Sequence, residues 1–374
     1  MENRKIRVAI THGDTNGIGY EVIFKTFSDP AMLELCTPIV YGSPKVAAYH
    51  RNALGIQANF TIINHVEEAH EGKLNLLAAF DDEVKVEMGQ PSKEAGEAAL
   101  KALERAITDY KNGLYDVLVT APINKNNIQS AQFHFAGHTE YIESCLGDGA
   151  KALMILLDER LRVALVTAHL PVKDIAQTIT KERILEKAAI FHKSLKRDFR
   201  IANPRIAVLS LNPHAGDAGV IGKEEEEIIV PAINELAEQG IQAFGPFAAD
   251  GFFGHGTYES FDGVLAMYHD QGLAPFKAID LGNGVNFTAG LPIVRTSPDH
   301  GTAYEIAGKG TADENSFRHA IYQAIDIFRY RIEYDKPMEH PLPKLYHERR
   351  DESEKVRFSI PKSKSDKKPE SENE

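Results

Sequence analysis

The chain has 374 residues, of which 43% are hydrophobic and 26% are charged, as is ordinary for a soluble globular protein of about two average domains. Its formal net charge of −12 opposes a general affinity for nucleic acid or anionic membranes, because both need a basic surface. With two cysteines, no apolar N-terminal signal segment and no apolar run long enough to span a bilayer, the chain is expected to be cytoplasmic.

Short β-branched runs alternate with polar or glycine-rich loops and helical patterns, which is typical of βαβ units in a parallel sheet. The near-continuous apolar character of five such runs indicates strands that helices cover on both faces. These strands are predicted at residues 6–11, 116–120, 162–167, 205–211 and 263–268. The sequence therefore predicts an α/β fold.

Three helices are predicted between these strands. The first begins after Ser92, a suitable N-cap residue, and ends at Gly113. Apolar residues at helical spacing predict the second helix over 184–199 and the third over 228–236. Four glutamates at 224–227 precede the third helix, where carboxylates favour the positive end of the helix dipole. We expect them to form a solvated helix start rather than a metal site.

Three of the predicted strands run into a histidine, namely His169, His214 and His269. Ligands collect at the carboxyl ends of strands in an open parallel sheet, so these side chains are expected to point into one crevice. Neutral imidazoles bind zinc and similar divalent ions, and three protein ligands with open positions describe a catalytic site. The alternative is that they are polar loop residues bonded to turns, which a chain with 15 histidines allows.

The loop after the first strand is rich in glycine. Gly13, Gly17 and Gly19 permit a close approach of the backbone to a ligand or to the following helix. Their order is not that of the dinucleotide-binding fingerprint. A tight turn that packs the helix against the sheet is an equally good interpretation.

Residues 282–313 form a second glycine-rich stretch, which is too long and too polar to be a simple connection. Lys277, Asn286 and Arg295 lie in or beside it. Such side chains bind phosphate and carboxylate, and arginine offers a bidentate fork. A surface salt bridge is the alternative for each charged residue.

Six motifs together resemble the 4-hydroxythreonine-4-phosphate dehydrogenase family, and they occur in the expected order between about residues 6 and 325. They are GDTNGIGYE, FAGHTEY, AHLP, LNPHAGD, YHDQGLAPFK and GVNFTAGLPIVRTSPDHGTA. The segment DHGTAYEIAGKGTAD is also similar to the cofactor-side loop of isopropylmalate and isocitrate dehydrogenases. The chain departs from the common family pattern at Thr15, Asn16, Tyr20 and Gly251.

The resemblance implies an isocitrate/isopropylmalate dehydrogenase-like subunit of two α/β/α domains with a central cleft, working as a homodimer. The first domain would comprise residues 1–137 and 294–346, and the second, which carries the metal ligands, residues 138–293. Residues 347–374 have mixed charges and few apolar side chains, and we expect them to form a disordered tail.

The resemblance also implies the residues of the site. One divalent ion, with zinc expected before magnesium or cobalt, would be held by His169, His214 and His269, the last supplied by the partner subunit. The substrate would be held by His138, Thr139, Lys277, Asn286 and Arg295, with Asp250 near the site.

The family uses NAD or NADP to oxidise 4-phosphooxy-L-threonine to 2-amino-3-oxo-4-phosphooxybutanoate. Loss of carbon dioxide then gives 3-amino-2-oxopropyl phosphate, in the biosynthesis of pyridoxal phosphate. Two alternatives remain from the sequence: a paralogue acting on 4-phospho-D-threonate or a related hydroxy acid, and a non-catalytic relative that binds metal or phosphate.

Overall fold

The computed structural model describes residues 4–80, 83–130, 133–280 and 282–339. The predicted tail at 347–374 and residues 340–346 of the predicted first domain lie outside these ranges. The chain up to Asp335 forms one compact unit. Within the described ranges, no helix combines the length and the apolar character needed to cross a membrane.

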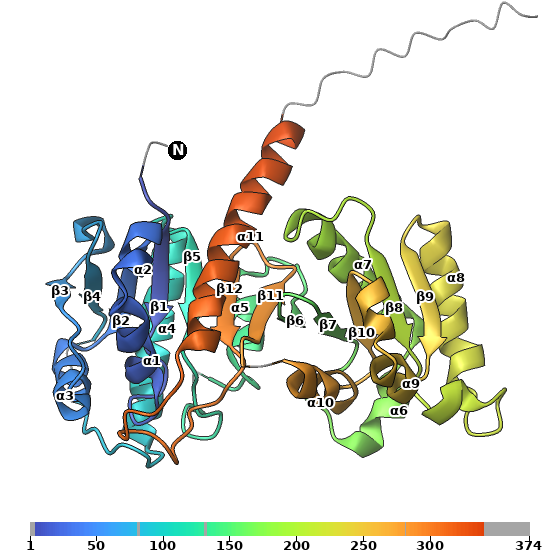
Figure 1. Cartoon of the computed structure of the whole chain (residues 1–374), viewed down its shortest axis with the longest axis horizontal. Coiled ribbons are helices and arrows are strands. Elements are labelled where there is room, and N and C mark those ends of the chain that lie inside the picture. Colours follow the sequence, from blue (N-terminus) through green and yellow to red (C-terminus); the bar gives the residue numbers. More distant parts are fainter. Residues whose placement is uncertain (1–3, 81–82, 131–132, 281, 340–374) are drawn as a thin grey trace, which may run out of the picture. The chain divides into compact units, whose positions relative to one another are not determined.

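The strands of the described residues form one mixed sheet, which runs through the compact unit (Figure 1). In order across the sheet they are β3 (Phe60–Ile63), β4 (Leu74–Ala78), β2 (Thr37–Gly42), β1 (Arg7–Thr11), β5 (Val117–Thr120), β12 (Val294–Pro298), β11 (Val285–Ala289), β6 (Leu153–Leu157), β7 (Arg162–Leu165), β10 (Gly263–Ala266), β8 (Arg205–Leu209) and β9 (Gln242–Phe247). Strand β11 is antiparallel to both of its neighbours, and β6 is antiparallel to β7. The other pairs are parallel.

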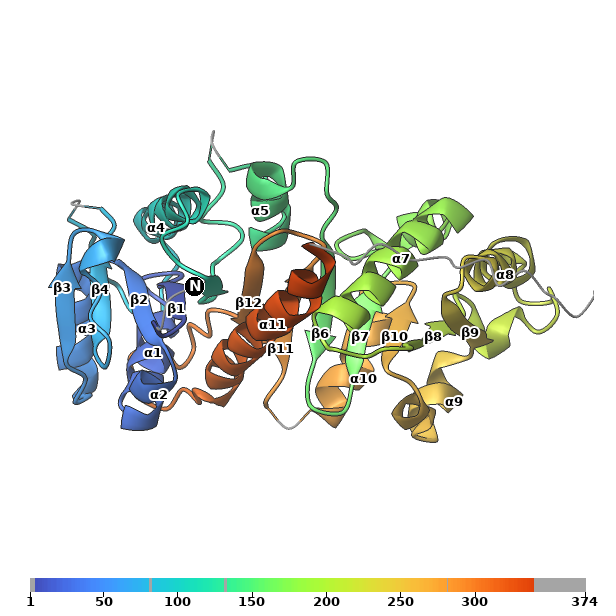
Figure 2. The same cartoon turned by 90° about the horizontal axis from the view of Figure 1, so that it is seen from above.

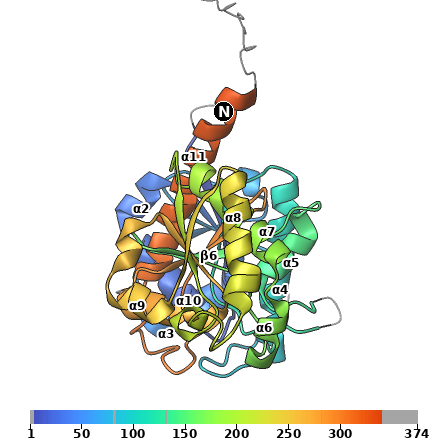
Figure 3. The same cartoon turned by 90° about the vertical axis from the view of Figure 1, so that its right-hand side faces the viewer.

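Helices cover both faces of this sheet. They are α1 (Gly19–Phe27), α2 (Pro30–Leu35), α3 (Pro44–Leu54), α4 (Lys93–Lys111), α5 (His138–Leu146), α6 (Ile175–Thr178), α7 (Lys181–Arg197), α8 (Val230–Glu238), α9 (Ala249–Gly254), α10 (His269–Ile279) and α11 (Asn315–Glu339). Figure 2 shows α4, α5, α7 and α8 on one face and α1, α2, α9, α10 and α11 on the other. Figure 3 shows the same separation, with α4, α5 and α7 to one side of the strands and α2 and α9 to the other.

Short helical turns complete the connections. They are η1 (Val66–Glu68), η2 (Val172–Asp174), η3 (Pro213–Gly216), the π-helical η4 (Glu225–Ile229) and η5 (Thr257–Ser260). The apolar core fills the space between the sheet and both helical layers, with Phe24, Phe287 and Phe317 among its fully buried side chains.

The five predicted strands are confirmed as β1, β5, β7, β8 and β10, and the α/β class is confirmed with them. Strands β5 and β10 are buried along their whole length, as continuous apolar runs predict. The interpretation of residues 282–313 as a functional loop is only partly right. Its first half forms the antiparallel pair β11 and β12 at the middle of the sheet.

The predicted helices are also present. Ser92 caps α4, and its Oγ accepts a hydrogen bond from Ala95 N at 3.2 Å. The second prediction corresponds to α7, and the third to η4 followed by α8. The expected solvated start of this third helix is wrong for Glu225, which is buried. Its carboxylate accepts hydrogen bonds from the backbone amides of Leu211 and Asn212, each at 2.8 Å.

The two predicted domains map onto the two halves of the sheet. Strands from residues 1–137 and 294–346 occupy consecutive places from β3 to β12, and strands from 138–293 occupy those from β11 to β9. The sheet is continuous across the β12–β11 pair, and the chain up to Asp335 behaves as one unit. The division into two domains therefore stays a prediction.

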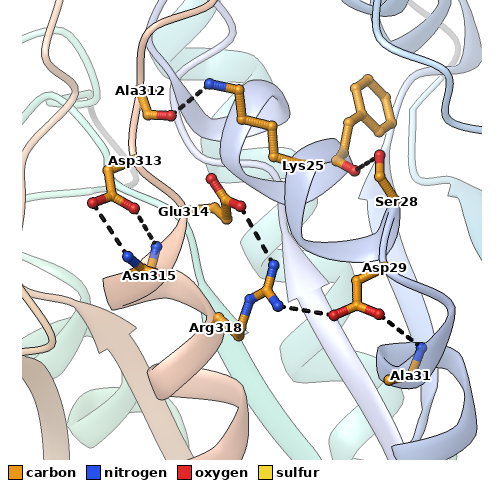
Figure 4. Close-up of polar contacts among 10 residues, drawn as sticks. Lys25, Ser28, Asp29, Ala31, Ala312, Asp313, Glu314, Asn315 and Arg318 are labelled. Atoms are coloured by element: carbon orange, nitrogen blue, oxygen red, sulfur yellow. Dashed lines mark hydrogen bonds and ion pairs between the residues drawn. The ribbon is translucent and has the colours of Figure 1, made fainter.

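Helix α1 holds the segment between β12 and α11, residues 299–314, against the first half of the sheet. Lys25 Nζ donates hydrogen bonds to the carbonyls of Gly310 at 2.9 Å and Ala312 at 2.6 Å. Arg318 at the start of α11 reaches Asp29 at 3.0 Å (Figure 4). These contacts fix a segment that has no regular secondary structure of its own.

Helix α11 is tied to α7 by a buried ion pair. Arg331 Nε donates to Asp198 Oδ1 at 2.7 Å, and both side chains are more than nine-tenths buried. The guanidinium also donates to the carbonyls of Leu291 and Pro292 in the turn between β11 and β12. The pair thus connects the last helix, α7 and the central turn.

We expect Asp198→Ala to lower the free energy of unfolding by about 3–5 kcal/mol, because it leaves the Arg331 charge buried without its partner. Urea unfolding followed by circular dichroism measures the change. The control is Asp326→Ala, which removes a half-exposed pair with Arg329 and should cost less than about 1 kcal/mol. Equal effects of the two substitutions would contradict this account.

Candidate active site

A pocket of about 210 Å³ opens where the two halves of the sheet meet. We call it the Arg295 pocket, and its functional side chains are Lys125, His138, Thr139, His169, Asn286 and Arg295. Lys125 follows β5 and Arg295 lies on β12, whereas the others come from the predicted second domain, residues 138–293. The join between β12 and β11 therefore brings side chains from both predicted domains into one cavity.

Arg295 is buried on β12, with 3% of its surface exposed. Its Nε and one terminal nitrogen donate to Thr120 Oγ1 at 3.1 and 2.6 Å, and the other terminal nitrogen donates to Thr288 Oγ1 at 3.2 Å. All these partners are neutral hydroxyls. Burial lowers the pKa of the guanidinium to about 10. Glu140 opposes this shift, but the hydrogen-bond partners found among the described residues are neutral, and such a buried cation favours an anionic ligand in the adjoining pocket.

His138 and Thr139 begin α5 and line the same pocket. Burial holds the pKa of His138 well below its usual value, and the charges of Arg295 and Lys125 act in the same direction. The imidazole is therefore neutral at neutral pH and offers one donor and one acceptor. Thr139 Oγ1 lies 3.4 Å from Thr288 Oγ1, the hydroxyl that also accepts from Arg295.

Asn286 and Lys277 lie in different surroundings. The side-chain oxygen of Asn286 on β11 is buried and has no hydrogen-bond partner within the described part of the chain, so it is free to accept from a ligand. Lys277 near the end of α10 contacts Asp299, with its Nζ at 3.2 Å from Oδ2 and 3.1 Å from the carbonyl. Burial raises the pKa of Asp299, and Lys277 opposes that shift.

His169 and His269 lie side by side in one chain, with ring centroids 5.9 Å apart. Each Nδ1 faces a carboxylate, that of Glu140 at 3.4 Å for His169 and that of Asp270 at 2.7 Å for His269. Carboxylates in this position orient the histidine ligands of metal sites. Lys125 Nζ lies 3.3 Å from Nε2 of His169. No group of three or more possible metal ligands occurs among the residues described for one chain.

His214 lies elsewhere, so the expected crevice of three strand-end histidines is only partly present in one chain. It lines a second cavity of about 480 Å³ together with Asp250, Asn212 and Phe253, which we call the His214 pocket. Asp250, on α9, is therefore also separate from the Arg295 pocket. Of the predicted site residues, the structure brings most to the Arg295 pocket or its rim and leaves these two together in another cavity.

The loop that carries His214 has a strained backbone. His214, Ala215, Asp217 and Ala218 have φ values of 53°, 53°, 46° and 51°, in the left-handed region that side chains other than glycine rarely adopt. Such strain persists only where the surroundings impose it, and it often marks a functional loop. Glu225 supplies part of that constraint through its bonds to the start of this loop.

The glycines of the first loop pack against protein backbone. A Cβ atom on Gly13 would lie 2.3 Å from the carbonyl oxygen of Pro122, and one on Gly17 would lie 2.8 Å from that of Thr302. Because the chain itself occupies this space, the structure supports the interpretation as a tight packing turn. The loop still borders the site indirectly, because Pro122 lines the Arg295 pocket.

Several residues of the site were not predicted as such. Lys125, Asp299 and His300 line the Arg295 pocket, and Glu140 faces His169. The position of Lys125 in the loop that follows a predicted strand was an available signal, since strand ends bear ligands in such sheets. Glu225 gave no comparable signal, because its run of glutamates is typical of a helix start.

The chain is similar to known proteins over most of its length. The family described as "Pyridoxal phosphate biosynthetic protein PdxA" matches residues 34–324. The 4-hydroxythreonine-4-phosphate dehydrogenase of Bacteroides thetaiotaomicron is 65% identical over 358 residues, which cover 96% of this chain and 98% of that protein. The enzyme of the same name from a Sulfurihydrogenibium species is 40% identical over 326 residues, with coverage of 87% and 99%.

A solved structure agrees with these relatives. The crystal structure of 4-hydroxythreonine-4-phosphate dehydrogenase from Klebsiella pneumoniae superposes with a TM-score of 0.74 at 32% identity and covers 87% of this chain and 99% of its own. The family match spans well over half of the chain, and the identities hold over nearly the whole length of the relatives. The chain belongs to the pyridoxal phosphate biosynthetic protein PdxA family.

Proposed function

We propose that the chain oxidises 4-phosphooxy-L-threonine with NAD or NADP, and that the product loses carbon dioxide to give 3-amino-2-oxopropyl phosphate. The observation that supports this most directly is Arg295, a buried cation at a pocket wall whose hydrogen-bond partners among the described residues are neutral hydroxyls. A substrate with a phosphate and a carboxylate supplies the missing negative charge. The near full-length identity to dehydrogenases of that name supports the reaction class.

Cationic and neutral side chains of the pocket would bind different groups of the substrate. Arg295 would bind an anionic group, and the free side-chain oxygen of Asn286 would accept from a substrate donor such as the amino group. His138, kept neutral by burial and nearby cations, would hydrogen-bond to a hydroxyl without adding charge. Thr139 and Lys277 would complete the contacts, with Lys277 shared with Asp299.

The nicotinamide cofactor would lie near the segment 299–314, which begins at the wall of the Arg295 pocket with Asp299, His300 and Gly301. When bound, the cofactor accepts hydride from the substrate carbon, while the protein supplies placement and electrostatics. The contacts of Lys25 with Gly310 and Ala312 would keep this segment in position.

His169 and His269 would hold a divalent ion, with Glu140 and Asp270 orienting the two rings. When bound, such an ion supplies Lewis acidity to the substrate hydroxyl and stabilises its deprotonated form. Lys125 Nζ lies 3.3 Å from His169 Nε2, the nitrogen left for the ion, and would have to move aside when the ion binds.

A third ligand would come from a partner subunit. Because His169 and His269 are adjacent in one chain, their arrangement favours His214 as the crossing residue, rather than His269 as the resemblance had implied. Asp250 lines the same cavity as His214 and would cross with it. A two-fold homodimer would make both sites composite, since the same surfaces meet reciprocally.

The first test is an assay of nicotinamide reduction with 4-phosphooxy-L-threonine and with 4-phospho-D-threonate as the competing substrate. We expect turnover with the L-threonine derivative and loss of turnover on chelation. His269→Ala should lose bound divalent metal, whereas His65→Ala, at an exposed histidine, should keep it. Preference for 4-phospho-D-threonate would favour the paralogue, and unchanged metal content in His269→Ala would refute the metal assignment.

Arg295→Gln should raise the KM for the phosphorylated substrate by about tenfold or more, because a charge-assisted hydrogen bond contributes roughly 1.5–3 kcal/mol. Glutamine can still donate to the hydroxyls of Thr120 and Thr288, which limits the loss of structure. Steady-state kinetics measure the effect, with Arg329→Gln as a control of equal charge change on the surface. The assignment fails if both variants keep the wild-type KM.

Mixing inactive subunits tests which histidine crosses. If His214 crosses, His169→Ala and His214→Ala subunits together form heterodimers with one intact site, and about one quarter of wild-type activity returns at random mixing. The His169→Ala and His269→Ala pair should then recover nothing, because each heterodimer site keeps one defect. The opposite pattern would mean that His269 crosses, and recovery by neither pair, with exchange verified by mass spectrometry, would rule out a shared site.

A further inference from the structure

A second cavity shares a wall with the Arg295 pocket. It has a volume of about 310 Å³, and the two cavities have Thr139, Glu140, Met154 and His169 in common. We call it the Arg183 pocket, because α7 sends Arg183 into it, and Lys187 from the next turn as well. Neither Arg183 nor Lys187 is among the site residues predicted from the sequence.

Arg183 and Lys187 are four residues apart and lie on one face of α7. Arg183 Nε donates to the carbonyl of Val166 at 3.1 Å, and Lys187 Nζ donates to the carbonyl of Ala152 at 3.2 Å. Both contacts are partly buried, and within the described chain neither cation forms a salt bridge. Each side chain therefore keeps further N–H donors for a ligand.

The carboxylates of the cavity are already engaged. Glu143 accepts from the backbone amide of Ala152 at 2.8 Å and lies 3.3 Å from Lys151 Nζ. Glu140 faces Nδ1 of His169 at 3.4 Å. Glu186 and Glu143 oppose the lowering of the Lys187 pKa by burial, but among the described residues neither carboxylate of the pocket forms a close ion pair with Arg183 or Lys187.

We propose that the Arg183 pocket binds a phosphate group, held between the terminal nitrogens of Arg183 and the ammonium of Lys187. Two cations suit a doubly charged tetrahedral anion better than a single carboxylate, and the arginine fork matches phosphate geometry. Burial lowers the pKa of Lys187, and Arg183 acts in the same direction. A bound anion would therefore stabilise the charged form of Lys187.

The shared wall gives this site a consequence for the proposed reaction. Thr139 and His169 line both cavities, so an anion beside Arg183 lies next to groups assigned to substrate and metal. The phosphate could be inorganic or could belong to the phosphorylated substrate itself. Both sources present the same chemistry, and the inference rests on the pocket and needs no turnover to be tested.

The experiment titrates the full-length chain with inorganic phosphate by isothermal calorimetry, in an Arg295→Gln background that weakens the neighbouring site. Adding Arg183→Gln and Lys187→Gln should weaken the remaining phosphate binding by about tenfold or more, because both charges are lost. Glutamine keeps a donor for the carbonyls of Val166 and Ala152, which protects the fold. The control pair, Lys181→Gln and Lys193→Gln, makes the same charge change on the same helix outside this cavity.

Thermal unfolding without phosphate checks that the variants are folded, and its phosphate-induced upward shift gives an independent measure of binding. Equal phosphate affinity in the Arg183/Lys187 pair and the control pair would overturn the proposal, as would acetate binding as tightly as phosphate. The KM for substrate separates the two sources in the otherwise wild-type chain. A raised KM in the Arg183/Lys187 pair identifies the substrate's own phosphate, and an unchanged KM identifies inorganic phosphate.

Discussion

The burial of the Arg295 charge at the middle of the sheet is the constraint on which the site depends. A guanidinium with 3% exposure loses most of its hydration, and its partners here are the hydroxyls of Thr120 and Thr288. Hydrogen bonds to neutral hydroxyls do not neutralise this charge, and the carboxylate of Glu140 only partly opposes the effect of burial, so the pKa of the guanidinium stays lowered. Strands β5, β12 and β11 hold Thr120, Arg295 and Thr288 in fixed register, so the guanidinium stays buried despite the lost hydration. An anionic ligand would offset the free energy that this burial costs.

The same register explains why the site lies at this place in the sheet. Strand β12 runs parallel to β5, whereas β11 runs antiparallel to β12, so the ends of parallel strands meet an antiparallel pair there. Thr288 and Arg295 are direct partners across the β11–β12 pair. The ion pair of Arg331 with Asp198 stabilises the turn behind that pair through the carbonyls of Leu291 and Pro292. A buried contact remote from the pocket thereby supports the position of the guanidinium.

The strands that could be predicted are those whose residues form continuous apolar runs in the sequence. Strands such as β5 and β10 are covered on both faces, so their residues need no alternation. Strands β11 (VNFTA) and β12 (VRTSP) escaped prediction because neither is a continuous apolar run, and their side chains Asn286, Arg295 and Ser297 line the Arg295 pocket. The histidines were recognisable from their place after strands. Spacing along one chain could not show that His214 lies in a different cavity from His169, because the direction of a strained loop depends on contacts such as those of Glu225.

Positive charge around His138 has a further consequence for the site. Arg295 and Lys125 both disfavour protonation of this imidazole, and burial disfavours it most, so its pKa is well below the usual value. A proton that binds His138 would add a third positive charge beside two cations, which mild acid cannot impose on a buried ring. His138 therefore keeps one donor and one acceptor over the pH range in which an unperturbed histidine changes charge. The cations that attract an anionic substrate thus also keep the neighbouring imidazole in the neutral form that can bind its hydroxyl.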